Sequence, residues 1–199
     1  MTPAGAADPS RAGQYRQPLV AAAAELTTRS GWASVTMARL ADEIGVSRQT
    51  VYNEMGSKQA LAEAMIHEEF TRFLAVVEHA FDTHRDDLVE SIRAAAREVL
   101  EMAHDNALLR SVVSATHGAD TELLPLLTTH AQPLLSIAKS VTVERLVPFA
   151  LPFAERELAA AVDVFVRAVL SHVMQPTGSP QDTADDIAWV VARTLRHEP

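Results

Sequence analysis

Apolar side chains recur along this chain at intervals of three and four residues, and no segment alternates apolar with polar positions as a half-buried strand would. The first predicted helix has Leu19 and Leu26 on one face and ends at Gly31. Pro152 and Pro180 stand where helix starts tolerate proline. An all-α fold of about nine helices is therefore expected, with approximate ranges 18–30, 37–44, 47–53, 58 onward, 87–104, 107–117, 121–147 with a break near Pro133, 152–175 and 180–196.

The second and third of these helices are short and are separated by a tight turn. Thr36 and Ser47 stand where an N-cap hydroxyl accepts a backbone N–H, and a valine immediately before each cap is spaced to pack on its own helix. Gly45 ends the first helix at a position where a positive φ is needed. This arrangement predicts a helix-turn-helix.

The second helix of this pair carries polar side chains in its first turns. Arginine can bond guanine bidentately, glutamine or asparagine can bond adenine, and the threonine methyl can contact thymine. A solvated polar face is the alternative for an isolated helix, but the preceding turn favours base recognition, because such a helix enters the major groove by its N-terminal turn. The outward-facing residues are Arg48, Gln49, Thr50, Tyr52 and Asn53.

Lys58 follows a serine that can cap the next helix, so it lies in a first turn where the helix dipole disfavours a cation. Unpaired backbone N–H groups and a lysine side chain together form a suitable phosphate site. An exposed lysine without a role is the alternative.

The net charge of −9 is unevenly distributed. Residues 1–58 hold six Lys/Arg and five Asp/Glu, whereas residues 59–199 hold 11 and 21. The acidity therefore belongs to the C-terminal part, and the N-terminal part is free to approach an anion such as DNA.

The composition of the chain excludes several kinds of site. The chain is 48% hydrophobic and has no cysteine, so a disulfide framework, a thiolate metal site and a cysteine nucleophile are all excluded. The absence of a signal peptide core and of an 18-residue apolar run predicts a cytoplasmic protein with no membrane partner. The basic residues are nearly all arginine, which suggests a bacterial source.

The segment from Ser34 to Leu61 resembles the DNA-binding domain of the TetR family of transcriptional regulators. The elements that carry the resemblance are Thr36, Ala41, Gly45, Val46, Ser47, Thr50, Val51, Tyr52, Ser57 and Lys58. The resemblance implies a flexible arm (1–16), a helix-turn-helix domain (17–60) and a helical ligand-binding and dimerisation domain (61–199). It also implies phosphate contacts from Thr36, Tyr52 and Lys58, base contacts from Arg48, Gln49, Thr50 and Asn53, and Ser47 within the same DNA-binding set.

Two residues depart from the family pattern, which has aromatic and basic residues ending in phenylalanine after the tyrosine. Met55 replaces the phenylalanine with a side chain of similar volume, and little packing is lost. Glu54 brings a negative charge near DNA, and it either faces away or accepts a hydrogen bond from a cytosine amino group.

The last two predicted helices each carry an apolar stripe, and these stripes predict a homodimer interface. A helix-turn-helix protein that binds two DNA half-sites needs such a dimer. The alternative is that both stripes pack inward. The expected interface residues are Leu158, Val162, Phe165, Val166, Val169, Val173, Ile187, Val190, Val191 and Leu195.

A few polar residues stand among the apolar middle helices, as they would in a ligand site. A surface or hydrogen-bonded role is the alternative for each histidine, and no spacing indicates a metal site or a cofactor. The candidate ligand contacts are Glu101, His104, Arg110, His117, His130 and His172.

These patterns favour a repressor that binds a palindromic operator in double-stranded DNA and is released by a small, fatty-acid-like effector. One alternative is a constitutive DNA-binding regulator without an effector. Another is an enzyme on a helical scaffold, but no catalytic residues are predicted, because nucleophile-elbow, P-loop and dinucleotide motifs are missing from the sequence.

Overall fold

The structure, a computed structural model, describes residues 13–114 and 122–195. The predicted arm up to residue 12 and His117 lie outside these residues. Within the described ranges the chain forms helices and no strand, so the all-α prediction is confirmed. No helix in this part of the chain is long and apolar enough to cross a membrane.

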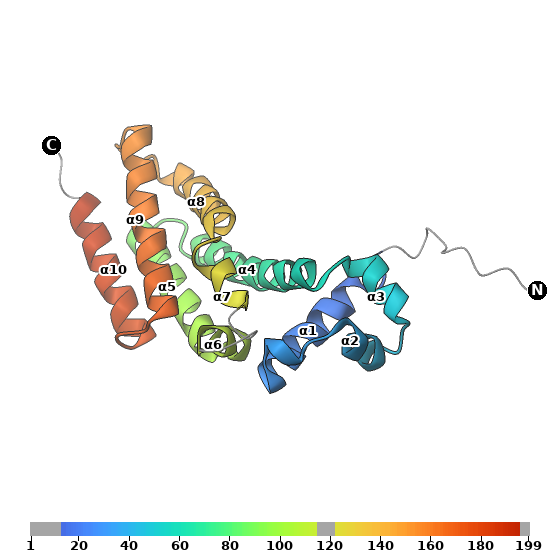
Figure 1. The fold of residues 1–199 in the computed structure, drawn as a ribbon. Coiled ribbons are helices and arrows are strands. Elements are labelled where there is room, and N and C mark those ends of the chain that lie inside the picture. Colours follow the sequence, from blue (N-terminus) through green and yellow to red (C-terminus); the bar gives the residue numbers. More distant parts are fainter. Residues whose placement is uncertain (1–12, 115–121, 196–199) are drawn as a thin grey trace, which may run out of the picture.

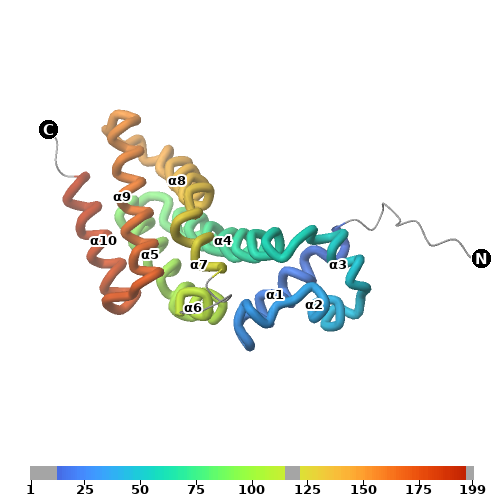
Figure 2. The backbone as a smooth tube through the Cα atoms, in the orientation of Figure 1, coloured from blue at the N-terminus to red at the C-terminus, as the bar shows by residue number. Residues whose placement is uncertain are grey.

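The N-terminal helices gather at one end of the molecule, and the long helix α4 runs from them to a bundle at the other end (Figures 1 and 2). The N-terminal elements are α1 (Arg16–Ser30), the 3-10 turn η2 (Trp32–Ser34), α2 (Met37–Ile44), α3 (Arg48–Met55) and α4 (Lys58–Thr83). The remaining elements are α5 (Leu88–Asp105), α6 (Ala107–Ser114), α7 (Leu124–Leu127), α8 (Gln132–Leu146), η4 (Val147–Phe149), α9 (Glu155–Met174) and α10 (Pro180–Leu195).

The helix expected over 121–147 is divided in two. α7 ends at Leu127, and α8 begins at Gln132 with Pro133 in its first turn. Proline fits there because its fixed φ suits the start of a helix. A backbone N–H in the first turn has no acceptor within the helix, so proline loses no hydrogen bond by lacking one.

One apolar core joins the N-terminal helices to the rest of the molecule. Leu19, Leu40 and Val51 from α1, α2 and α3 are fully buried together. The same cluster contains Leu61, Ala62 and Met65 of α4, together with Leu108 and Val112 of α6 and Leu123 before α7. The N-terminal packing unit therefore continues past the expected boundary at residue 60 and into α4.

Helix α8 is held against its neighbours by ion pairs. Arg145 bonds Glu78 of α4 at 2.7 Å, and this hydrogen bond raises the pKa of the Arg145 guanidinium. Asp163 of α9 bonds Lys139 of α8 at 2.9 Å and Arg167 at 2.8 Å. The hydrogen bond from Lys139, followed by the one from Arg167, lowers the pKa of the Asp163 carboxyl.

Candidate DNA-binding surface and ligand cavity

The helix-turn-helix forms through the local signals seen in the sequence. The Oγ1 of Thr36 accepts the N–H of Arg39 at 3.1 Å, and the Oγ of Ser47 accepts the N–H of Thr50 at 3.1 Å. Gly45 has φ +76°, in the left-handed region that glycine adopts without steric cost. These contacts fix α3 at a sharp turn from α2.

Helix α3 presents a polar face to solvent. Arg48, Gln49, Tyr52 and Asn53 are exposed, and Tyr52 retains 51% of its accessible surface. Gln49 donates from Nε2 to the Oδ1 of Asn53 at 2.8 Å, so the two amides lie side by side one turn apart. Thr50 is half-buried, and its hydroxyl lies 2.9 Å from that of Ser47. These four side chains form the solvent-exposed face of α3.

Lys58 is held at the start of α4 by Trp32. Its Nζ donates to the carbonyl oxygen of Trp32 at 3.1 Å and lies 4.6 Å from the centre of the indole ring. The indole is buried, and its Nε1 donates to Glu122 Oε2 at 3.0 Å. The ammonium carries three donors, so the bond to Trp32 leaves two for a phosphate.

Glu54 turns its carboxylate toward the start of α1. Its Oε1 accepts the N–H of Gly13 at 3.1 Å, and its own carbonyl oxygen accepts a hydrogen bond from Arg16 Nη1 at 3.3 Å. Of the two orientations left open by the sequence, this is the one that faces away from the exposed side of α3.

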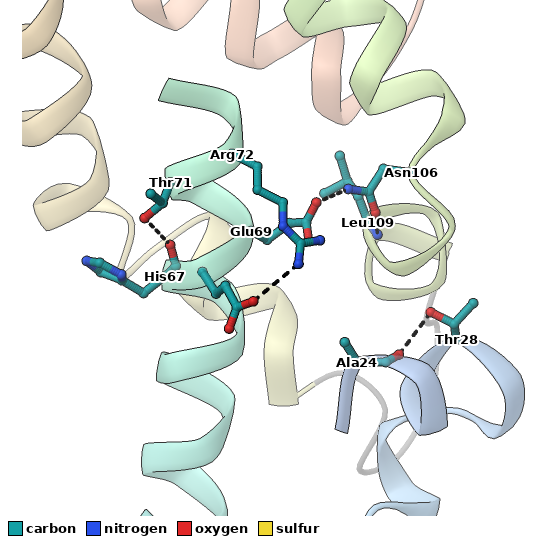
Figure 3. A network of polar contacts seen from close by, with 9 residues as sticks. Ala24, Thr28, His67, Glu69, Thr71, Arg72, Asn106 and Leu109 are labelled. Atoms are coloured by element: carbon teal, nitrogen blue, oxygen red, sulfur yellow. Dashed lines mark hydrogen bonds and ion pairs between the residues drawn. The ribbon is translucent and has the colours of Figure 1, made fainter. Parts of the chain in front are cut away.

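An apolar cavity of about 230 Å³ lies inside the C-terminal bundle. Side chains from α4, α5, α6, α8, α9 and α10 line it, and Glu69 and Thr142 are the polar residues among the described lining. The carboxylate of Glu69 accepts hydrogen bonds from Arg72 Nη1 at 3.2 Å, an arginine that also pairs with Glu68, and from the side-chain amide of Asn106 (Figure 3). The cavity, called here the tail cavity, therefore favours apolar occupants.

A second cavity, of about 460 Å³, adjoins the first and is called here the head cavity. It contains His104, Arg110 and His172, and it shares Leu109, Val173 and Met174 with the tail cavity. Arg110 is exposed and donates to the carbonyl oxygen of His104. The head cavity thus places one arginine and two histidines beside the apolar tail cavity.

Three of the six predicted ligand contacts are brought together in the head cavity: His104, Arg110 and His172. Glu101 and His130 line neither cavity, and their contact with a ligand stays a prediction. Glu101 is exposed and lies 3.9 Å from Arg97, one turn back along α5, and His130 is exposed after α7. Within the described residues no group of three or more acidic or histidine side chains could hold a metal ion.

Nine of the ten predicted dimer residues lie wholly or partly against their own bundle, and their place in an interface stays a prediction. Val162, Ile187 and Val191 are buried within their own chain. Six others are partly buried against the bundle cores or the cavities: Leu158, Phe165, Val166, Val169, Val173 and Leu195. Val190 is exposed. The reason is that α9 and α10 cover the cavities and α5, so this bundle uses their apolar stripes itself.

The outward faces of α9 and α10 carry exposed apolar side chains, of which the sequence pattern singled out Val190 but not Val164 or Trp189. Val164 is 63% exposed, Trp189 is 60% exposed and Val190 is 44% exposed. Arg193 stacks over the Trp189 ring, with its guanidinium carbon 5.1 Å from the ring centre. Large exposed aromatic and aliphatic side chains on adjacent helices are typical of a contact surface.

Helix α6 touches both the tail cavity and the N-terminal core. Leu108 and Val112 line the cavity and also belong to the core that contains α1, α2 and α3. Ser111 donates from Oγ to the carbonyl oxygen of Thr27 in α1 at 3.3 Å. Asn106 accepts the N–H of Leu109 at 2.7 Å and caps α6, and its amide also reaches Glu69 of α4.

Two family models match the chain in the order of its two parts. Residues 19–65 match a model described as bacterial regulatory proteins of the tetR family. Residues 87–193 match a model described as the C-terminal domain of the bacterial tetracyclin repressor.

Individual relatives agree with these matches. The chain is 26% identical, over 93% of its length and 86% of the relative, to the HTH-type transcriptional regulator AlkX of Mycobacterium tuberculosis. It is 25% identical to the solved TetR family repressor AlkX of a Dietzia strain, implicated in biodegradation of n-alkanes, with a TM-score of 0.72 and coverage of 89% and 96% of the two chains. The structure of RolR with resorcinol has a TM-score of 0.60 at 16% identity, covers 94% of each chain and shares the fold.

Proposed function

The chain belongs to the TetR family of bacterial DNA-binding regulators, and from this premise we propose that it is a cytoplasmic repressor released from its operator by a fatty-acid-like molecule. The single observation that carries the proposal is the apolar tail cavity, which shares three lining residues with a head cavity that holds an arginine and two histidines. The hydrocarbon chain of such a molecule suits the tail cavity, and its carboxylate suits the head cavity. No catalytic step is part of this function.

On the DNA side, α3 enters the major groove and Arg48, Gln49 and Asn53 meet base edges. Tyr52 and Lys58 reach phosphates on either side, and the Thr36 hydroxyl, which accepts a backbone N–H, keeps its own proton to donate to a phosphate. Thr50 contributes its methyl group, and Ser47 holds the hydroxyl of Thr50.

On the effector side, the hydrocarbon chain occupies the tail cavity and the carboxylate lies in the head cavity. Each buried methylene contributes about 0.8 kcal/mol. The guanidinium of Arg110 pairs with the carboxylate, and His104 and His172 flank it. The Dietzia relative is a repressor implicated in biodegradation of n-alkanes, and this association supports a hydrocarbon-derived effector here.

The effector acts on DNA binding through α6. A tail in the cavity contacts Leu108 and Val112, the same side chains that pack against the N-terminal core. A ligand can shift a conformational equilibrium only by its differential affinity for the two states. Displacing α6 moves α1 and α4, and the two recognition helices of a dimer leave the ~34–36 Å spacing of successive major grooves.

The dimer that binds a palindromic operator forms through the outward faces of α9 and α10. Val164, Trp189 and Val190 supply its apolar centre, and Arg193 lies beside Trp189. This surface keeps Val190 from the interface that the sequence predicted and adds Val164 and Trp189, and α3 lies outside it.

The test is a titration with fatty acids of 8 to 18 carbons, followed by tryptophan fluorescence and by operator binding. Trp32 reports on the domain junction, because its indole is bonded to Glu122, and Trp189 reports on the dimer face. We expect saturable fluorescence changes and loss of operator binding over the same concentrations.

A matched comparison locates the carboxylate. Arg110→Gln should weaken release by dodecanoate about tenfold, since a charge-assisted hydrogen bond is lost, and should leave release by dodecanol unchanged. Arg85→Gln is the control, because Arg85 is exposed and lines neither cavity. Absence of any saturable signal, with operator affinity constant throughout, would refute the fatty-acid effector and favour the constitutive regulator.

A further inference from the structure

Trp32 connects the start of α4 to the residues that lead into α7. Its indole Nε1 donates to the carboxylate of Glu122 at 3.0 Å, and its carbonyl oxygen accepts a hydrogen bond from Lys58 Nζ at 3.1 Å. Trp32 is 2% exposed and its indole carries a single N–H, so loss of the carboxylate would deprive a buried donor of this acceptor. The orientation of the indole therefore depends on Glu122.

The indole in turn holds the ammonium of Lys58. Nζ lies 4.6 Å from the centre of the ring, within the distance at which an aromatic face attracts a cation. An indole that turned away would leave Nζ with the carbonyl oxygen of Trp32 and without the ring face. A lysine that is already fixed loses less side-chain freedom when it binds a phosphate, so its position in the free protein contributes to DNA affinity.

Glu122 lies on an element that also touches the tail cavity. Leu123, the next residue, is 1% exposed and is buried in the same N-terminal core as Trp32. Leu127, at the end of α7, packs against that core and lines the tail cavity. Because α7 is short, a hydrocarbon tail that displaces Leu127 also moves Glu122.

We propose that Glu122 is a positioning residue for DNA binding, which holds Lys58 ready for a phosphate through the indole of Trp32. Occupancy of the tail cavity weakens this hold by moving α7. The inference rests on the DNA binding and the effector of the proposed function, and it adds a connection from the cavity to the lysine that does not pass through α6.

The experiment measures operator affinity at several salt concentrations, with the full-length protein and an operator that it selects itself from random duplex DNA. Failure of the unmodified protein to select any sequence would overturn the proposed function, whereas the variants below test the inference alone. Glu122→Ala should weaken binding about tenfold, because each of two subunits loses a lysine that is fixed in advance. It should also lower the slope of log affinity against log salt toward that of Lys58→Ala, because a phosphate contact is lost.

Two further variants serve as matched controls. Glu122→Gln should keep most of the affinity and of the salt slope, because its amide oxygen still accepts the indole N–H. Glu155→Ala removes an equal charge from an exposed position at the start of α9 and should leave both quantities unchanged.

The link to the cavity has its own readout, the ratio of operator affinities without and with saturating dodecanoate. Glu122→Ala has already broken the connection that the effector weakens, so this ratio should fall by the same factor, about tenfold. An equal ratio in both proteins would overturn the role of α7. An unmodified protein that does not respond to dodecanoate would overturn the proposed effector, whereas the affinity and the salt slope still decide the positioning role of Glu122.

The sign of the Glu122→Ala effect and its dependence on Lys58 are decisive. A carboxylate that acts on DNA by its charge alone repels phosphates, so its removal would tighten binding. A residue that only supports folding would lower the melting temperature and leave the salt slope unchanged. In the Lys58→Ala background there is no ammonium to position, so Glu122→Ala should cause no further loss. Tighter binding, an unchanged salt slope or an equal loss in both backgrounds would overturn the proposal.

Discussion

Filling the tail cavity from its α8 wall should make the repressor resistant to its effector without altering DNA binding. Ala138 lines the cavity and is half-buried. Ala138→Leu adds three carbons to space that the hydrocarbon tail would occupy. If three methylenes of the tail are displaced, the lost burial is about 2.4 kcal/mol, or about 60-fold in effector affinity.

The assay is the concentration of dodecanoate that releases half of the bound operator, measured for the unmodified protein and for two variants. Ala75→Leu is the matched control, since Ala75 of α4 is exposed and lines neither cavity. Ala138→Leu should raise the half-release concentration about 60-fold, and Ala75→Leu should leave it unchanged.

Two further measurements separate a loss of effector binding from a loss of folding. Operator affinity without effector should be the same for both variants, and the melting temperature of Ala138→Leu should not fall, because the added side chain enters open space. A fall by the equivalent of about 1–3 kcal/mol would indicate overpacking instead. An unchanged half-release concentration in a stable Ala138→Leu protein would refute the placement of the tail.

The other predictions concern DNA, the dimer and acid stability. Arg48→Ala should cost about 1–3 kcal/mol of operator affinity and relax preference at one base position, measured by gel shift on single-base variants. Lys58→Ala should weaken binding to all sequences alike and reduce the slope of log affinity against log salt by about one. Trp189→Asp should give a monomer by light scattering, because it places a charge in the apolar centre of the interface. The pKa of Asp163 is lowered in the folded state, chiefly by Lys139, so its stabilising effect is present above the ordinary carboxyl pKa of 3.8 and is lost as pH falls below it. The urea midpoint of Asp163→Asn should therefore change less between pH 6 and pH 3 than that of the unmodified protein.

The helix-turn-helix was predictable because its signals are local. A cap hydroxyl and the N–H that it accepts are three residues apart at Thr36 and again at Ser47, and Gly45 provides the positive φ at the turn. Such contacts form within one turn of a helix, so the sequence of that turn largely determines them.

The direction of the C-terminal stripes was not predictable in the same way. A period of 3.6 residues shows that one face of a helix is buried, but the same stripe suits a partner subunit, an internal core or a cavity wall. Val162 and Val191 are buried inside the chain, whereas Trp189 faces outward on the other side of α10. Only the packing of α9 and α10 on the bundle distinguishes these possibilities.

The residues of the head cavity were predictable only in part. His104, Arg110 and His172 come from α5, α6 and α9, and the choice of polar residues in apolar surroundings found all three. Glu101 met the same criterion and is exposed, as His104 is, but it lies about one turn before His104 along α5 and lines neither cavity. Composition can therefore nominate convergent residues, but the position of each residue along its packed helix decides which of them converge.

Helix α6 explains why a cavity of this kind can control a DNA-binding domain through few contacts. Leu108 and Val112 belong to the N-terminal core and also line the tail cavity. Repacking them around the hydrocarbon tail of an effector would therefore change their fit against α1. Asn106 links the start of the same helix to Glu69 of α4, the helix that begins at Lys58 (Figure 3). We therefore expect a displacement of α6 to be transmitted to the helix-turn-helix in two ways, through its contacts with α1 and through α4 to Lys58.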